Sequence, residues 1–301
     1  MGPVSDSTRP ARRGRLARSA AGLAVLCALA SYVAVHQVTG SKGAPRCAVG
    51  GGDQRYEFTP DQASNAATIA AVGSARGLPE RAVTIALATA LQESALRNIE
   101  HGDRDSLGLF QQRPSMGWGT PEQIMDPVYA AEKFYEGLEK VPGYSRMPLT
   151  VAAQKVQKSG FPQAYAKHEP DAALLSAALT GRTPAGLTCT ADVREGRPGD
   201  PAVVRAELVR AFGDAAAPTS VSGGASAGRS AAEPAVLVVP AGDTERRGWE
   251  LAQWAVARAD TLRVAEVAYG GKVWRADDSG GGWEDASAGQ DSSSVRLRLA
   301  R

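Results

Sequence analysis

A single carboxylate, Glu93, stands at the end of an apolar stretch of the chain. The eleven residues 82–92 are all uncharged, and the next basic residue is Arg97. Packing beside Ile85 and Leu91 would remove water from the carboxyl group and raise its pKa, and a place at the negative end of a helix would act in the same direction. We expect such an acid to stay protonated near neutral pH if Arg97 faces solvent. The alternative is an ordinary helical Glu that points into water.

Other kinds of chemistry find little support in the sequence. The three histidines, His36, His101 and His168, are isolated, without a second ligand at zinc spacing. The sequence contains no GxSxG elbow, Walker loop or dinucleotide fingerprint. The net charge of +2 and the scattered basic residues give no case for nucleic acid binding. We therefore expect no cofactor, no metal and no nucleic acid partner.

The residues that follow Glu93 form a recognisable pattern. Glu93 and Ser94 are followed by a polar turn and then by Ser-Leu-Gly-Leu-Phe-Gln at 106–111. This resembles the lysozyme-like domain of soluble lytic transglycosylases and goose-type lysozymes, whose signature is Glu-Ser followed by Ser-x-Gly-Leu-(Met/Phe)-Gln. "DPVYAAEKFYEGLEKV" at 126–141 is similar to the next helix of that family. The resemblance covers about residues 55–182.

The resemblance implies a mainly α lysozyme-like fold and cleavage of the MurNAc–GlcNAc β-1,4 bond of peptidoglycan. Such cleavage needs a protonated acid to donate to the leaving oxygen, and Glu93 would be that acid and then the base. In lytic transglycosylases the 6-hydroxyl of the sugar itself attacks C1, so no second acid is needed. Inverting hydrolases use a second acid to hold a water. Asp103 and Asp105 are the candidates for that second acid, and the alternative for both is a surface turn residue. The residues implied to contact or line the substrate site are Ser94, Ser106, Gly108, Leu109, Phe110, Gln111 and Gln112, with Tyr129 and Tyr135 behind them.

This sequence departs from the family in one respect. Members of the family usually carry an Ala-Tyr-Asn segment in a later helix, and its tyrosine points at the catalytic acid. We align that segment with "TVAAQKVQKSG" at 150–160, which carries no tyrosine. Gln154 or Gln157 would then take its place and could still bond to Glu93. The substitution leaves a transglycosylase, a hydrolase and a domain that only binds glycan as open alternatives.

The elements that must position Glu93 are predicted to be helices. Thr59, Pro60 and Gln62 form a capping box with proline at the first helical position, and Gly77 suits the end of that helix. Pro79 opens the helix that carries Glu93. Further helices are predicted at 124–141, 148–159, 170–181 and 201–213, and no strand between 55 and 190.

The N-terminal residues indicate the cellular compartment in which the rest of the chain lies. Five arginines in residues 1–18 precede residues 19–38, which contain no charged side chain and are long enough to span a bilayer. This predicts a transmembrane anchor with an extracytoplasmic chain after it. A cleaved secretory signal ending near "ALA" at 28–30 is the alternative. Cys47 and Cys189 bracket the helical block, and outside the cytoplasm they predict a disulfide.

The remaining boundaries follow from composition. Residues 39–54 are glycine-rich and predict a tether, 55–190 the lysozyme-like domain, 191–213 a helical extension and 214–233 a linker. Residues 234–301 predict a small α+β module that holds four of the five tryptophans, with a hairpin at Gly270-Gly271. The module resembles a domain found at the end of actinobacterial cell-wall proteins, which implies an interaction or wall-binding role.

The leading hypothesis is a peptidoglycan-cleaving enzyme at the cell membrane or secreted, and the alternative is a non-catalytic peptidoglycan-binding scaffold. The sequence identifies no protein partner.

Overall fold

The helices around Glu93 begin and end close to where the sequence predicts. We analysed a computed structural model, which describes residues 45–52, 54–191, 193, 197–223, 233–277, 282–286 and 292–301. The first of the helices, α2 (Pro60–Ala75), is capped by Thr59, whose hydroxyl accepts from the Gln62 amide at 3.3 Å while the Gln62 side chain accepts from the Thr59 amide at 2.8 Å. Gly77 follows the helix in the left-handed region, with φ +67°. The predicted capping box is therefore confirmed.

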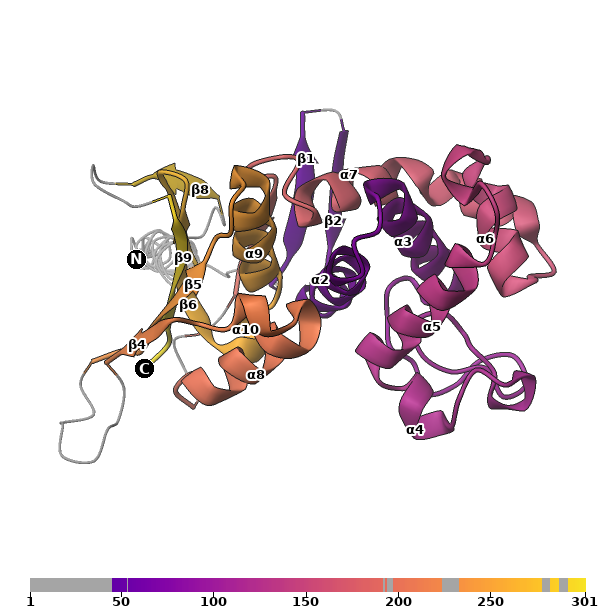
Figure 1. The fold of residues 1–301 in the computed structure, drawn as a ribbon, viewed down its shortest axis with the longest axis horizontal. Helices are drawn as coiled ribbons and strands as arrows, with labels where there is room; N and C mark the ends of the chain where they lie inside the picture. The colour runs from indigo at the N-terminus through magenta and orange to yellow at the C-terminus, as the bar shows by residue number, and fades with distance from the viewer. Residues whose placement is uncertain are drawn as a thin grey trace, which may run out of the picture. The chain divides into compact units, whose positions relative to one another are not determined.

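The helical part of the chain surrounds α3, the helix that ends at the predicted acid (Figure 1). Residues Ala82–Leu91 of α3 are all buried, because α2, α5, α6 and α7 pack around it. The helix predicted at 124–141 begins at Pro127 instead, because Asp126 caps it by accepting from the Val128 amide at 2.9 Å, and Ile124 is the last residue of the short helix before it. The helices of this part are α2 (Pro60–Ala75), α3 (Glu80–Ser94), α4 (Pro121–Ile124), α5 (Pro127–Glu139), α6 (Leu149–Gln157) and α7 (Glu169–Leu179), with 3₁₀ turns η1 (Pro114–Met116), η2 (Tyr144–Arg146) and η3 (Pro162–His168).

A small antiparallel sheet in order β2-β1-β3 corrects two predictions. Residues 39–54 are not simply a tether, because β1 (Cys47–Gly51) and β2 (Gln54–Phe58) form a hairpin there. Strands also occur between 55 and 190, since β2 extends into this range and β3 (Leu187–Cys189) pairs with β1. Glycine-rich β1 has weak strand propensity. The sheet is completed by β3, which lies about 140 residues further along the chain.

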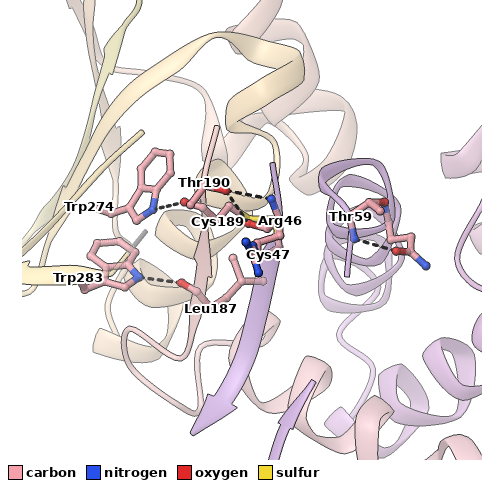
Figure 2. Close-up of a disulfide and its surroundings, with 9 residues drawn as sticks. Arg46, Cys47, Thr59, Leu187, Cys189, Thr190, Trp274 and Trp283 are labelled. Carbon is pink, nitrogen blue, oxygen red and sulfur yellow. Dashed lines mark hydrogen bonds between the residues drawn. A yellow bond between two sulfur atoms is a disulfide. The ribbon is translucent and has the colours of Figure 1, made fainter. Parts of the chain in front are cut away.

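The predicted disulfide joins Cys47 and Cys189, which lie directly opposite each other on β1 and β3. Both cysteines are buried. The residues next to the disulfide are also hydrogen-bonded to each other. Arg46 N donates to Thr190 Oγ1 at 2.9 Å, and Thr190 N donates to Arg46 O at 2.8 Å (Figure 2). The bridge thus ties the beginning of the described chain to the end of the helical part.

The C-terminal residues form the predicted α+β arrangement around an antiparallel sheet. Its order in the described residues is β4-β5-β9-β6-β7-β8. The turn between β6 and β7 uses Gly270 and Gly271 at φ +57° and +74°, which confirms the predicted hairpin. Residues 214–233 are not linker throughout, because β4 lies within them. The elements are α8 (Pro201–Phe212), η4 (Asp214–Ala216), β4 (Ser220–Ser222), β5 (Val236–Pro240), α9 (Glu245–Ala257), α10 (Ala259–Leu262), β6 (Val264–Tyr269), β7 (Lys272–Arg275), β8 (Trp283–Asp285) and β9 (Ser294–Leu299).

The sheet and the helical part share one helix, α9, and residues 45–301 form one compact unit. This helix contacts β6 and β9 on one side and α2, α7 and β3 on the other (Figure 1). Its Gln253 side chain is fully buried, donates to Ala178 O at 2.8 Å and accepts from Leu187 N at 2.8 Å. Both Trp249 and Trp254 on this helix are buried.

Two further tryptophans bind the backbone of β3 from the sheet side. Trp274 Nε1 donates to Cys189 O at 3.0 Å, and Trp283 Nε1 donates to Leu187 O at 2.8 Å (Figure 2). A buried indole N–H usually finds such an acceptor, and here the acceptors are carbonyls next to the disulfide. The tryptophan-rich residues thus pack against the helical part rather than facing solvent.

The predicted transmembrane or signal segment at 19–38 and the basic tail at 1–18 lie outside the described residues. Among the residues that are described, no helix is long and apolar enough to cross a membrane.

Candidate active site

Glu93 is the second-last residue of α3, and the chain turns sharply away after it. Ala95 and Leu96 both adopt left-handed backbone angles, with φ 53° and 58°. Amide side chains of α2 hold this turn, because Gln62 Nε2 donates to Ala95 O and Asn65 Nδ2 to Leu96 O, each at 2.8 Å. Such angles are costly for residues other than glycine, so these bonds stabilise a turn that the local sequence does not favour.

The turn separates Glu93 from the nearest basic residue. Arg97 is exposed, and its Nε lies 3.4 Å from the Ser94 carbonyl oxygen. The condition set by the sequence, that Arg97 should face solvent, is therefore met. Burial raises the pKa of the half-buried Glu93 carboxyl, and Arg97 is not among the groups that counteract this effect.

A tyrosine binds the Glu93 carboxyl directly. Tyr165 Oη donates to Glu93 Oε1 at 2.6 Å from the 3₁₀ segment η3. Tyr165 is fully buried, and burial together with this bond holds the pKa of its hydroxyl well above the ordinary value. The phenol therefore stays a donor, and its bond to the carboxylate lowers the pKa of Glu93 without cancelling the effect of burial.

The prediction that a glutamine replaces the tyrosine was wrong. Tyr165, within Ala164-Tyr165-Ala166, donates to Glu93, so the acid has a tyrosine partner. The alignment placed the segment on α6, whereas the tyrosine lies in the 3₁₀ turns that follow. The Ala-Tyr dipeptide was the signal that could have located it.

The two glutamines have other partners. Gln154 Nε2 donates to Ser159 O at 2.8 Å and so closes the loop after α6. Gln157 Nε2 donates to Phe110 O at 2.7 Å, and a hydrogen bond from the same side chain also lowers the pKa of Glu93. Gln157 thus binds the backbone of residues 107–112 and acts on Glu93 beside Tyr165 instead of replacing it.

The strip at 107–112 is a tight loop held against the end of α3. Leu107 and Gln112 exchange backbone hydrogen bonds of 2.9 and 3.0 Å, and Ser94 Oγ donates to Leu109 O at 2.8 Å. Gly108 has φ +74°, and a Cβ there would lie 2.7 Å from Ile124 O, so the position requires glycine. The signature residues thus place a backbone loop beside the acid.

Several residues predicted to contact substrate are buried, which corrects their roles. Leu109, Phe110 and Tyr135 are fully buried, as the Phe110 ring stacks on Phe134 at 4.7 Å and Tyr135 Oη donates to Ile69 O at 2.9 Å. The side chains of Ser94, Ser106 and Gln112 are also buried, and Gln112 Nε2 donates to Ala130 O at 3.1 Å. These side chains shape the loop from beneath instead of touching a ligand.

Two of the predicted positions are more open. Gln111 is half-buried, and its Nε2 donates to Gly108 O at 3.3 Å. Tyr129 is half-buried, and its hydroxyl donates to the Trp118 carbonyl at 3.2 Å. Trp118 itself is partly buried and packs against the core.

The candidates for a second acid are surface residues. Asp105 accepts from Arg113 Nε and from the Ser115 amide, each at 2.8 Å, and these bonds hold its pKa well below the usual range. Both of its oxygens are therefore occupied in bracing the loop 105–115. Asp103 is exposed. Among the described residues, no group of three or more His, Cys, Asp or Glu side chains could hold a metal ion.

Two other features of the surface contain no residue of the group around Glu93. His168 is half-buried, and its Nε2 lies 3.2 Å from Gln92 Oε1. A hollow between α8, β4 and the C-terminus includes Pro198, Val203, Val221 and Arg301 and contains no residue of the predicted site. The group able to do acid–base chemistry at the end of α3 is thus Glu93, and Tyr165 hydrogen-bonds to it.

Comparison with known proteins concerns the other end of the chain. A family model described as VldE, C-terminal domain, matches residues 207–295. The match begins within α8 and continues into β9, so it includes α9 and most of the sheet but neither Glu93 nor Tyr165. No curated protein matches the chain.

Removing the Tyr165 hydroxyl should change the pH dependence of any acid catalysis by Glu93. Because that hydroxyl stabilises the carboxylate, Tyr165→Phe should raise the pKa of Glu93. An acid catalyst is lost as pH rises through its pKa, so the alkaline limb of kcat/KM should move to higher pH. The measurement is a pH–rate profile, with Tyr269→Phe, remote in the sheet, as the matched control. A limb that stays in place or moves to lower pH would contradict the assignment.

Proposed function

We propose that the protein cleaves the glycan strands of peptidoglycan at the MurNAc–GlcNAc β-1,4 bond, on a lysozyme-like helical domain, with Glu93 as the acid and then the base. The observation that carries the proposal is the Tyr165–Glu93 hydrogen bond of 2.6 Å to a carboxyl group whose pKa is raised by burial. A protonated, oriented acid is what departure of a sugar oxygen requires near neutral pH.

The reaction that fits these residues best is transglycosylation. Glu93 donates its proton to the glycosidic oxygen as the C1–O bond breaks. The ionised Glu93 then takes the proton from the 6-hydroxyl of the same MurNAc while that oxygen bonds to C1, which leaves a 1,6-anhydro end. No second carboxylate is needed, and this agrees with Asp105 being held by Arg113 and Ser115. Tyr165 and Gln157 orient the acid in both steps.

The location proposed for this activity is outside the cytoplasm, with the chain anchored in the membrane through residues 19–38 or released after cleavage of that segment. The Cys47–Cys189 disulfide supports the proposal, because such bonds persist in oxidising compartments. The partner would be peptidoglycan itself.

Product analysis tests the proposal. Purified residues 45–301 incubated with peptidoglycan sacculi should release fragments with 1,6-anhydro-MurNAc ends, identified by mass spectrometry. Reducing ends would contradict transglycosylation and indicate a hydrolase. Binding to sacculi without any product would contradict catalysis and favour a non-catalytic scaffold.

A further inference from the structure

Residues 158–161 connect α6 to η3 in a loop fixed by its own hydrogen bonds. Lys158 ends α6 with φ 53°, and the Gln154 side chain donates to the Ser159 carbonyl at 2.8 Å. The Phe161 amide donates to Ser159 Oγ at 3.1 Å. These hydrogen bonds therefore give the loop a defined shape.

Both ends of this loop reach the Glu93 carboxyl. Gln157 precedes the loop and lowers the pKa of Glu93, and Tyr165 follows it and donates to Glu93 Oε1 at 2.6 Å. Ser159, within the loop, also lowers the pKa of the Tyr165 hydroxyl. The loop consequently connects two residues that act on the acid.

Phe161 is the aromatic residue that this loop presents to solvent. Its exposed fraction is 79%, whereas the other four phenylalanines of the chain, Phe58, Phe110, Phe134 and Phe212, are each at most 6% exposed. One exposed apolar side chain needs no functional reason in itself. An aromatic ring on the loop that joins Gln157 to Tyr165, two residues that act on the acid, is a more specific arrangement.

We propose that Phe161 is a stacking platform for a pyranose ring of the glycan strand, next to the bond that Glu93 cleaves. A pyranose exposes C–H groups on its faces, and burying them against an aromatic ring removes apolar surface from water on both sides. A ring carries this surface on few rotatable bonds, so little entropy is lost on binding. The inference rests on the proposed function, since it assigns a glycan to the same site.

A binding experiment on a non-cleaving background tests this assignment. The full chain carrying Glu93→Gln is titrated with soluble, uncrosslinked GlcNAc–MurNAc strands by isothermal titration calorimetry. Adding Phe161→Ala should weaken Kd about tenfold, and Phe161→Leu should weaken it similarly because the ring is lost. Adding Phe161→Trp should keep Kd within about twofold. Val221→Ala, an exposed apolar residue on β4, is the control and should leave Kd unchanged.

The outcomes separate this proposal from the function on which it rests. If the Glu93→Gln protein binds no glycan strand, the glycan substrate is contradicted, and the platform with it. If it binds and Phe161→Ala behaves as Val221→Ala does, the platform alone is wrong. Strands with and without stem peptides should show the same loss, and a loss confined to peptide-bearing strands would overturn the sugar-stacking role. Far-UV circular dichroism should be unchanged in all variants, because the Phe161 side chain is exposed.

Discussion

Glu93→Gln should reduce the release of peptidoglycan fragments by about 10³-fold, the scale expected when a general acid–base group is removed. Glutamine keeps the size of the side chain and can still accept from Tyr165, so the hydrogen bond at the end of α3 can persist. It cannot donate a carboxylic proton to the leaving oxygen. The variant should therefore fold and bind glycan while losing cleavage, measured as the initial rate of soluble fragment release.

The matched control for this substitution is Glu100→Gln. Glu100 is an exposed acid in the turn that follows α3, and it carries the same change in charge at a place outside the Tyr165–Gln157 group. Its rate should equal that of the unaltered protein. Undiminished release by Glu93→Gln would overturn the catalytic assignment, and an equal loss in both variants would show that net charge, not the acid, is responsible.

Removing the Cys47–Cys189 disulfide should lower the free energy of unfolding by about 4 kcal/mol, since the bridge closes a loop of 142 residues and restricts the unfolded chain. Alanine at both positions avoids burying new hydroxyl groups, because both cysteines are buried. The loss should be large because the bridge fastens β1 to β3, and β3 in turn supplies the carbonyls bound by Trp274 and Trp283. Chemical denaturation of residues 45–301, monitored by tryptophan fluorescence, measures the change.

Reduction provides the control for the disulfide prediction. Residues 45–301 contain no other cysteine, so reductant should lower the denaturation midpoint of the unaltered protein to that of the Cys47→Ala/Cys189→Ala variant. The variant itself should not respond to reductant. A midpoint of the unaltered protein that reductant does not change would mean that the bridge contributes nothing to stability.

Much of the helical framework could be predicted from local sequence. The Thr59–Gln62 capping box, the turn at Gly77 and the hairpin at Gly270-Gly271 depend on residues within a few positions of one another. Such features are determined by backbone angles and nearby hydrogen bonds, which is why the sequence alone was sufficient. The small sheet was missed because β1 needs β3, and the energy of that pairing comes from residues that are distant in the chain.

The site shows the same division between local and distant information. An apolar run that ends in Glu93, followed by Ser94 and the loop at 107–112, was enough to select the acid from the sequence. The identity of its partner was not, because Tyr165 lies 72 residues away in a 3₁₀ segment without strong periodicity. Side chains such as Leu109 and Phe110 were predicted at the substrate, and packing around α3 and α5 buried them instead.

The sequence by itself thus determined which carboxyl group is surrounded by apolar residues, which cysteines can pair and where most helices begin and end. These properties depend on composition and on contacts between near neighbours. Only the tertiary structure decided that Tyr165 donates to Glu93, that Arg97 faces solvent and that the tryptophan-rich residues pack on β3. The reason is physical, since the burial and hydrogen bonding of a group depend on which distant segments pack around it.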